Sequence, residues 1–335
     1  MKKAAIVVGK AYAGNKLFDL EDCTLNRDNC LYPFYLLKEK LKAHGYDLAT
    51  SDIHPLAEAD IVIYNEMPKV LPSEEEIAKS YLLLFESELI IPRNWDLSKH
   101  RFFRKIFTWA DNFVDGSKYI KMNFPQNLPG EINFDHMEKN RFCTIIAGNK
   151  MVKHNLELYS QRIKAIRWFE AKHPDQFDLY GMGWDNYTKT ESKLLKLLRK
   201  IKLFERWLKP VYTSYRGKVE NKNQVLREYK FSICYENARD IPGYITEKIF
   251  DCFFAGCVPV YWGANNVFQY IPSKTFIDRR KFATYEALYQ YMSTMKDEEY
   301  QAYLENIKKF LESDKFKAFS AEVFADTIVN GLIHE

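Results

Sequence analysis

A lysine next to a glutamate, at the predicted start of a helix, suits the binding of a nucleoside diphosphate. Lys248 adds a full positive charge to the partial positive charge of the unpaired N–H groups in a first helical turn, and together they favour a pyrophosphate. Glu247 offers acceptor oxygens to two neighbouring hydroxyls, such as those of a ribose. Tyr244 offers a flat face to a base or a sugar. Each of these residue types is also common in helix starts or packed loops, so their surroundings must support the interpretation.

One βαβ unit is predicted to hold these residues. Residues 230–236 alternate in the manner of a strand, a polar loop with a Pro-Gly pair follows, and residues 257–262 read as a second strand. Between them we predict a helix that Thr246 caps and Gly256 ends. Parallel strands place such a helix start at the carboxyl edge of the sheet, where α/β proteins hold phosphorylated ligands. This edge would carry Glu236, Asn237, Tyr244, Glu247 and Lys248.

Five short motifs follow one another in order through this unit. They are Tyr-Lys-Phe at 229–231, Glu-Asn at 236–237, Gly-Tyr-Ile-Thr-Glu-Lys at 243–248, Ala-Gly-Cys-Val-Pro-Val at 255–260 and Trp-Gly at 262–263. Such an ordered run is far more specific than a lone glycine motif, and it resembles the signature of the α-1,3-fucosyltransferases, or family 10 glycosyltransferases. The resemblance implies a GDP-fucose donor, inversion at the anomeric carbon and an α/β GT-B architecture, with two Rossmann-like domains facing across a cleft. It also implies that the donor is bound by Glu236, Asn237, Tyr244, Thr246, Glu247 and Lys248.

Length and composition describe a globular protein of two domains. The chain has 335 residues, of which 47% are hydrophobic and 28% charged, enough to bury two cores. The net charge of +4 is too small to indicate a nucleic-acid partner, and we predict none.

Cysteine usage and the N-terminus predict the cellular location. The six cysteines form no CxxC pair and are expected to be free thiols in a reducing compartment. The first apolar run is too short for a signal peptide or an anchor, so we predict a strand there. Animal members of the resembled family carry an N-terminal anchor, and its absence predicts a bacterial form. We expect it to be cytoplasmic, or peripheral on the inner face of the cytoplasmic membrane.

Glu86 is the candidate general base. Residues 81–85 fit one buried strand, and Glu86-Ser87-Glu88 stands at its carboxyl end, where partial desolvation would raise the pKa of a carboxyl toward the range useful to a base. In the resembled family a Glu at an equivalent strand end, followed by Ser or Asn, activates the acceptor hydroxyl. Glu86 fits that position best, with Glu88 as its rival and a solvated surface glutamate as the plainer alternative. Glu88 and Trp95 are predicted to contact the acceptor.

Short alternating β and α segments predict the division into domains. Residues 1–140 would form an acceptor-side Rossmann-like domain, with the Pro-, Asn- and Gly-rich stretch 123–140 as the linker. Residues 141–315 would form the GDP-fucose-binding Rossmann-like domain. A terminal helix in 316–335 would pack back toward the first domain.

The second domain is predicted to supply further positive charge to the donor. Family members carry an Arg in the first helix of this domain that contacts the donor pyrophosphate. Arg162 matches it, and Arg167 is a weaker candidate. An Arg on a helix is more often simply solvated. Arg216, Lys218 and Lys222 are predicted to extend the positive rim.

Residues 190–210 are a basic amphipathic insertion that departs from the family pattern. Within it, residues 193–209 place leucines and other apolar side chains on one helical face and seven basic residues around the rest. This composition is typical of an interfacial helix on an anionic membrane. A helix packed on its own domain with a solvated outer face is the equal alternative.

Together these features predict an inverting α-1,3-fucosyltransferase. Its acceptor would be an oligosaccharide or lipid-linked glycan that contains N-acetylglucosamine in an N-acetyllactosamine-like setting, as on bacterial surface polysaccharide. The sequence has no Asp-x-Asp, so no cofactor is expected and a divalent cation would at most stimulate. The alternatives are a GT-B transferase with another nucleotide sugar and a non-catalytic glycan- or nucleotide-binding protein.

Overall fold

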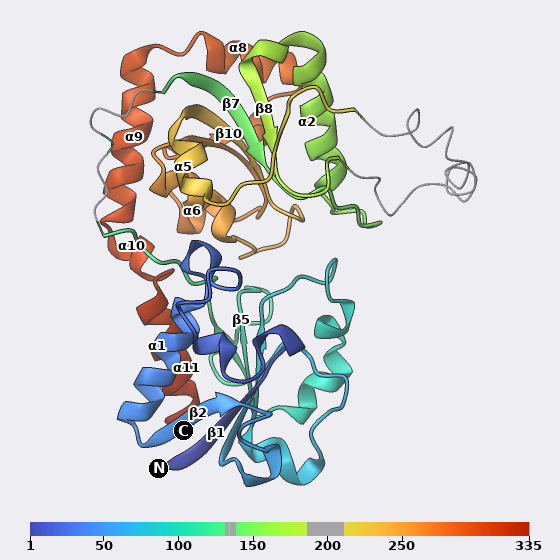
Figure 1. Cartoon of the computed structure of the whole chain (residues 1–335), viewed down its shortest axis with the longest axis vertical. Helices are drawn as coiled ribbons and strands as arrows, with labels where there is room; N and C mark the ends of the chain where they lie inside the picture. Colours follow the sequence, from blue (N-terminus) through green and yellow to red (C-terminus); the bar gives the residue numbers. More distant parts are fainter. Residues whose placement is uncertain (131–133, 135–138, 186–210, 335) are drawn as a thin grey trace, which may run out of the picture.

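The computed structural model describes residues 1–130, 134, 139–185 and 211–334, and these form two domains, each around a parallel sheet (Figure 1). In Figure 1 the first domain lies below the second, and both chain ends lie at the lower domain. A cavity lies between the domains. The predicted α/β architecture, with two Rossmann-like domains facing across a cleft, is confirmed.

The first sheet has the strand order β2-β1-β3-β4-β5-β6, and all of its neighbouring strands are parallel. Its strands are β1 (Lys2–Val7), β2 (Tyr46–Thr50), β3 (Ile61–Asn65), β4 (Ser80–Leu84), β5 (Lys105–Thr108) and β6 (Tyr119–Lys121). The α-helix α1 (Tyr32–Ala43) packs on this sheet through Leu37 and Leu41. Short 3-10 helices make the remaining connections: η1 (Lys10–Tyr12), η2 (Lys16–Phe18), η3 (Arg27–Asn29), η4 (Leu56–Glu58), η5 (Glu74–Lys79), η6 (Pro92–Trp95) and η7 (Leu97–Phe102).

The second sheet has the strand order β12-β11-β10-β7-β8-β9 and is also parallel. Its strands are β7 (Arg141–Ile146), β8 (Phe177–Tyr180), β9 (Tyr215–Gly217), β10 (Tyr229–Tyr235), β11 (Val258–Trp262) and β12 (Ile277–Asp278). Around them lie α2 (Tyr159–Lys172), η8 (Pro174–Gln176), α5 (Lys222–Arg227), α6 (Glu247–Phe254), α7 (Val267–Tyr270), η9 (Arg279–Lys281), α8 (Tyr285–Ser293) and α9 (Asp297–Leu311).

The predicted βαβ unit is confirmed as β10, α6 and β11. The two strands pair in parallel, with Tyr235 opposite Trp262. α6 buries Ile249, Phe250 and Phe253 against the sheet, and its chain reverses at Gly256, whose φ of +59° lies in the left-handed region that favours glycine. The helix therefore begins at the carboxyl edge of the sheet and faces the cleft.

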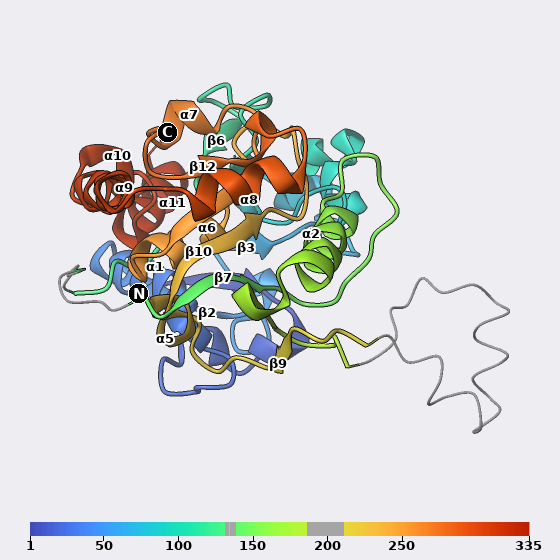
Figure 2. The same ribbon diagram turned by 90° about the horizontal axis from the view of Figure 1, so that it is seen from above.

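In the described residues the chain leaves the first domain after β6 and returns to it after α9, and these two crossings lie side by side. After α9, the segment α10 (Asp314–Lys317) leads to α11 (Ala321–Ile333), which lies against α1 of the first domain (Figure 1). At the crossing, the N–H of Gln126 donates to Phe319 O at 2.6 Å, and the N–H of Ala321 donates to Gln126 O at 3.1 Å. Seen from above, α9 to α11 gather on the opposite side of the molecule from α2 (Figure 2). This paired crossing connects the two walls of the cleft.

Candidate active site

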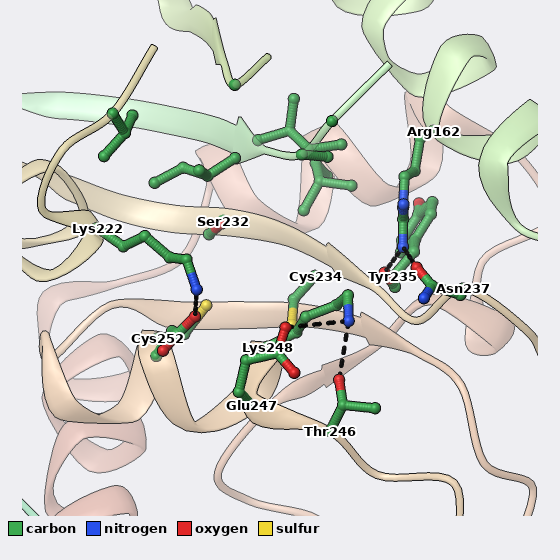
Figure 3. A pocket seen from close by; sticks show the side chains of 18 of the residues that line it. Arg162, Lys222, Ser232, Cys234, Tyr235, Asn237, Thr246, Glu247, Lys248 and Cys252 are labelled. Carbon is green, nitrogen blue, oxygen red and sulfur yellow. Dashed lines mark hydrogen bonds and ion pairs between the residues drawn. The ribbon is translucent and has the colours of Figure 1, made fainter. Parts of the chain in front are cut away.

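A cavity of about 380 Å³ between the domains brings together most of the predicted site residues (Figure 3). The first domain contributes Arg27, Glu86 and Phe124 to its lining. From the second domain come Ile145, Ile146, Ala147, Gly148, Lys150, Tyr159, Arg162, Gly181, Met182, Val219, Lys222, Leu226, Ser232, Ile233, Cys234, Tyr235, Asn237, Tyr244, Thr246, Glu247, Lys248, Asp251 and Cys252.

Lys248 lies at the start of α6 and is held by polar side chains (Figure 3). Its Nζ donates to Thr246 Oγ1 at 2.9 Å and forms ion pairs with Glu236 and Glu247, each at 3.3 Å. Burial alone would lower the pKa of the Lys248 ammonium, but the two carboxylates outweigh burial and raise it. Lys248 therefore stays charged at the edge of the cavity, with its side chain about one quarter exposed.

Glu236 supports this arrangement from below and does not line the cavity. Its side chain is fully buried, and its carboxylate accepts hydrogen bonds from the N–H of Thr246 at 2.8 Å and from Thr246 Oγ1 at 2.7 Å. The carboxylate thus binds the N–H and the hydroxyl of the residue that caps α6, as well as the charge of Lys248, which compensates the loss of its hydration. The prediction that Glu236 binds the donor directly is therefore corrected: it positions Thr246 and Lys248.

Arg162 is the second cation of this wall. It lies on α2, is only 4% exposed and donates to Tyr235 O at 2.6 Å and to Asn237 Oδ1 at 3.1 Å. The described residues give it no ion pair, and burial lowers the pKa of the guanidinium, which the nearby charge of Glu236 in part opposes. Figure 3 shows the guanidinium of Arg162 beside Tyr235 and Asn237, in the same pocket as Lys248. Arg167, the weaker candidate, instead pairs with Glu170 at 2.8 Å.

Glu86 lies on the opposite wall, two residues beyond β4. Burial raises the pKa of its carboxyl, the charge of Lys248 partly offsets this, and Glu247 adds to it. The structure separates the two rival glutamates, because Glu86 lines the cavity whereas Glu88 is exposed outside its lining. Trp95 is also absent from the lining: its ring packs on Trp109, with centroids 5.3 Å apart, and its Nε1 donates to Glu86 O at 3.1 Å. The indole therefore holds the backbone carbonyl of Glu86, and contacts of Glu88 and Trp95 with the acceptor stay a prediction.

Tyr244 does not offer a free flat face, and that prediction is wrong. The residue is 1% exposed, and its ring packs on Trp109 and Phe124 of the first domain, at centroid distances of 4.7 and 5.9 Å. Its hydroxyl accepts a hydrogen bond from Asn237 Nδ2 at 3.4 Å. The neighbouring Gly243 has a φ of +80°, and an added Cβ would come within 2.2 Å of Trp109 O. The loop before α6 is thus an interdomain contact as well as a wall of the cavity.

Glu247 projects from α6 with about half of its side chain exposed. Burial would raise the pKa of its carboxyl, but the charges of Lys248 and Lys222 outweigh burial and lower it to about 2. The group is therefore an ionised acceptor at neutral pH, which suits the predicted contact with ribose hydroxyls.

The predicted positive rim is present in part. Lys222 lines the cavity and forms ion pairs with Asp251 at 2.8 Å and with Asp28 of the first domain at 3.3 Å. Arg216 instead pairs with Asp178 at 2.5 Å, and neither Arg216 nor Lys218 lines the cavity.

Lys150, Asp251 and Tyr159 are among the lining residues with polar side chains that the sequence analysis did not assign. Lys150 follows β7 at the carboxyl edge of the sheet, where any loop residue was a candidate. Asp251 lies one helical turn after Glu247, on the same face of α6, a spacing that could have revealed it. Tyr159 stacks beneath the guanidinium of Arg162 at 4.9 Å. No sequence signal marked this tyrosine.

The predictions for 190–210 and the amphipathic helix at 193–209 concern residues that lie outside the described part of the chain. Among the helices that the structure describes, none is long and apolar enough to span a membrane.

Comparison with known proteins identifies the family. Residues 150–324 match the family described as "Glycosyltransferase family 10 (fucosyltransferase) C-term", and this match covers more than half of the chain. The α-(1,3)-fucosyltransferase FucT of Helicobacter pylori is 38% identical over 74 residues, which are 22% of this chain and 15% of that protein. The GDP-fucose protein O-fucosyltransferase 3 of Gallus gallus is 39% identical over 85 residues, 24% of this chain and 18% of that protein. The matched segments thus span less than a fifth of these relatives' own length.

Solved structures share the fold over the whole chain. An α1,3-fucosyltransferase crystallised with GDP-fucose matches with a TM-score of 0.56 at 15% identity, covering 100% of this chain and 91% of that one. HepE of Anabaena, in complex with UDP and glucose, matches with a TM-score of 0.54 at 13% identity, covering all of both chains. Because the family match covers the domain that holds α6 and Arg162, the chain belongs to glycosyltransferase family 10, the fucosyltransferases.

Proposed function

We propose that this protein transfers L-fucose from GDP-fucose to a hydroxyl of an N-acetylglucosamine-containing glycan, in α-1,3 linkage and with inversion. The observation that carries the proposal is a single cavity with Glu86 on one wall and the cations Arg162 and Lys248 on the other. Such an arrangement suits a reaction that needs a base on the acceptor side and positive charge on the leaving-group side.

The second-domain wall would bind the nucleotide and stabilise its departure. As the bond to fucose breaks, negative charge grows on the diphosphate, and Lys248, Arg162 and the N–H groups at the start of α6 would meet that charge. Ionised Glu247 would accept hydrogen bonds from the ribose hydroxyls. Removing one such cation should cost roughly 3 to 4 kcal/mol of transition-state stabilisation, by analogy with oxyanion-hole deletions.

The first-domain wall would activate the acceptor. Glu86 takes the proton of the acceptor hydroxyl, whose oxygen forms a bond to the anomeric carbon while the bond to the diphosphate breaks. One displacement of this kind converts β-linked GDP-fucose into an α-linked product. The burial that raises the pKa of Glu86 makes the carboxylate a stronger base, provided that the pH is above that pKa.

The reaction is proposed to need no metal ion. In place of a metal, the side chains of Lys248 and Arg162 would carry the positive charge beside the diphosphate. Transfer in the presence of excess EDTA should therefore proceed, and addition of Mg²⁺ or Mn²⁺ should at most stimulate it.

The decisive experiment is to incubate the protein with GDP-fucose and a panel of oligosaccharide and lipid-linked acceptors, then determine product mass and linkage. An added deoxyhexose in α-1,3 linkage to N-acetylglucosamine is expected. A thermal-shift comparison of GDP with UDP and ADP tests the donor, because another nucleotide sugar would shift the preference. Release of GDP without any fucosylated product, or no turnover at all, would contradict the proposed transfer.

A second acceptor class is suggested by particular relatives. Proteins from Gallus gallus, Bos taurus and Xenopus tropicalis, each named GDP-fucose protein O-fucosyltransferase 3, match this chain at 35% to 39% identity over 85 or 86 residues. The acceptor panel should therefore include folded protein domains with exposed Ser and Thr. A fucosylated hydroxyl there, without glycan products, would reassign the acceptor while leaving the donor chemistry in place.

A further inference from the structure

Glu66 is an unusual residue directly beneath the proposed base. It follows β3, its backbone φ is +75°, and its N–H donates to Leu83 O at 2.9 Å. A side chain other than glycine rarely adopts such a φ, and residues that do so concentrate at functional sites. The strained residue lies next to β4, the strand that leads to Glu86.

The carboxylate of Glu66 forms hydrogen bonds with the backbone at Glu86. Its oxygens accept hydrogen bonds from the N–H of Glu86 at 2.9 Å and from the N–H of Phe85 at 3.4 Å. They also accept from Asn94 Nδ2 at 2.5 Å. Three donors therefore converge on one carboxylate, which has enough lone pairs to serve them all.

Asn94 binds the carbonyl of Glu86, which belongs to the next peptide group along the chain. It is fully buried, its Nδ2 also lies 3.2 Å from Glu86 O, and its Oδ1 accepts from the N–H of Met67 at 3.0 Å. With Trp95 Nε1 on the same carbonyl, both polar backbone atoms of Glu86 are fixed by side chains. The orientation of the Glu86 side chain is thereby set by residues outside the cavity lining.

We propose that Glu66 is a positioning residue for transfer: its carboxylate, together with Asn94, holds the Glu86 backbone so that the Glu86 carboxylate faces the acceptor hydroxyl. The inference rests on the proposed role of Glu86. Burial raises the pKa of the Glu66 carboxyl to about 7, even though the backbone N–H of Glu86 and the amide of Asn94 oppose this rise, so ionising the carboxyl at this position is costly. A strained backbone and a buried carboxylate thus coincide at the residue that orients the base.

The test compares Glu66→Gln with Glu75→Gln, an exposed glutamate of the same domain, in the full-length protein. The amide in Glu66→Gln keeps the shape but leaves one acceptor oxygen for three donors. We expect kcat for fucosyl transfer to fall on the order of 10- to 100-fold, since small misplacements of a catalytic group have effects of this size. The affinity for GDP, measured by titration calorimetry, should stay within about twofold, because the donor contacts belong to the other domain. Glu75→Gln should match the wild type in both measurements.

Two outcomes would overturn the inference. One is wild-type kcat in Glu66→Gln, and the other is a parallel loss of kcat, GDP affinity and melting temperature, which indicates a general structural role. If Glu66→Gln does not fold, Glu66→Asp keeps the charge but shortens the reach, and wild-type kcat in that variant would also overturn it. Glu86→Gln, measured alongside, separates the two proposals. If Glu86→Gln retains transfer, Glu86 is not the base. If Glu86→Gln is inactive while Glu66→Gln is fully active, only the positioning role of Glu66 is contradicted.

Discussion

The two walls of the cleft use their charges in different ways. On the second-domain wall, Lys248 and Glu247 of α6 line the cavity and pair with each other, while the buried Glu236 pairs with Lys248 from below. On the first-domain wall, Glu86 faces the cavity while Glu66 and Asn94 hold its backbone from behind. The difference teaches that affinity for an anionic donor can be spread over several groups, whereas a proton transfer depends on the precise placement of one group.

The sharpest test of this comparison is Glu86→Gln. The amide cannot accept a proton, so transfer should fall roughly 10²- to 10⁴-fold, the usual contribution of a general base. The affinity for GDP should remain at the wild-type level, because the proposed nucleotide contacts lie on the other wall. Steady-state kinetics and GDP calorimetry check the two halves of this expectation.

Glu88→Gln is the matched control for that experiment, two residues away and exposed. It should retain wild-type transfer. An inactive Glu88→Gln beside an active Glu86→Gln would reverse the assignment of the base.

Lys248→Met should impair both binding and turnover. It removes the charge proposed to meet the departing diphosphate, and kcat should fall roughly 10²- to 10³-fold, as in oxyanion-hole deletions. GDP affinity should fall as well, in contrast to Glu86→Gln. The variant also leaves the buried Glu236 without its cationic partner, so its melting temperature must be measured. Lys315→Met, a change at an exposed lysine, is the control, and unchanged GDP affinity in Lys248→Met would argue against the donor role.

The pH dependence of stability measures how much burial of the Glu66 carboxyl lowers the free energy of unfolding. Burial raises the pKa of Glu66 from 4.5 to about 7, so between these values the folded protein holds a proton that the unfolded chain has released. This group therefore makes the free energy of unfolding fall as the pH rises through that window, by up to about 3 kcal/mol. In Glu66→Gln the fall should be smaller by that amount. Urea unfolding at pH 5 and pH 8 measures it, with Glu75→Gln expected to follow the wild type; equal slopes in Glu66→Gln and wild type would contradict the assignment.

The two walls also differed in how far the sequence predicted them. Glu247, Lys248 and Thr246 belong to one local βαβ unit. Its capping residue, apolar stripe and terminal glycine follow one another in the sequence and can be recognised there. Two predicted donor contacts on this wall were wrong because they depend on tertiary packing. Tyr244 is covered by Trp109 of the other domain, and Glu236 is buried below the helix. On the first wall, Glu86 could be placed by the end of its strand. Glu66 could not, because it contacts Glu86 across 20 residues of sequence through a backbone conformation that its residue type does not signal.

The smallest expected effect is an electrostatic one that links the two walls. Burial raises the pKa of the Glu86 carboxyl, and the charge of Lys248 lowers it. Transfer needs the ionised base, so kcat/KM should decrease as the pH is lowered through a midpoint above 4.5, the ordinary value for a glutamate. Without the lysine charge the pKa of Glu86 rises further, and the midpoint for the residual activity of Lys248→Met should therefore move to higher pH than in the wild type. The control Lys315→Met should leave the midpoint in place. A midpoint that stays fixed in Lys248→Met would show that the two walls act independently, whereas an upward shift places Lys248 and the base in one electrostatic site.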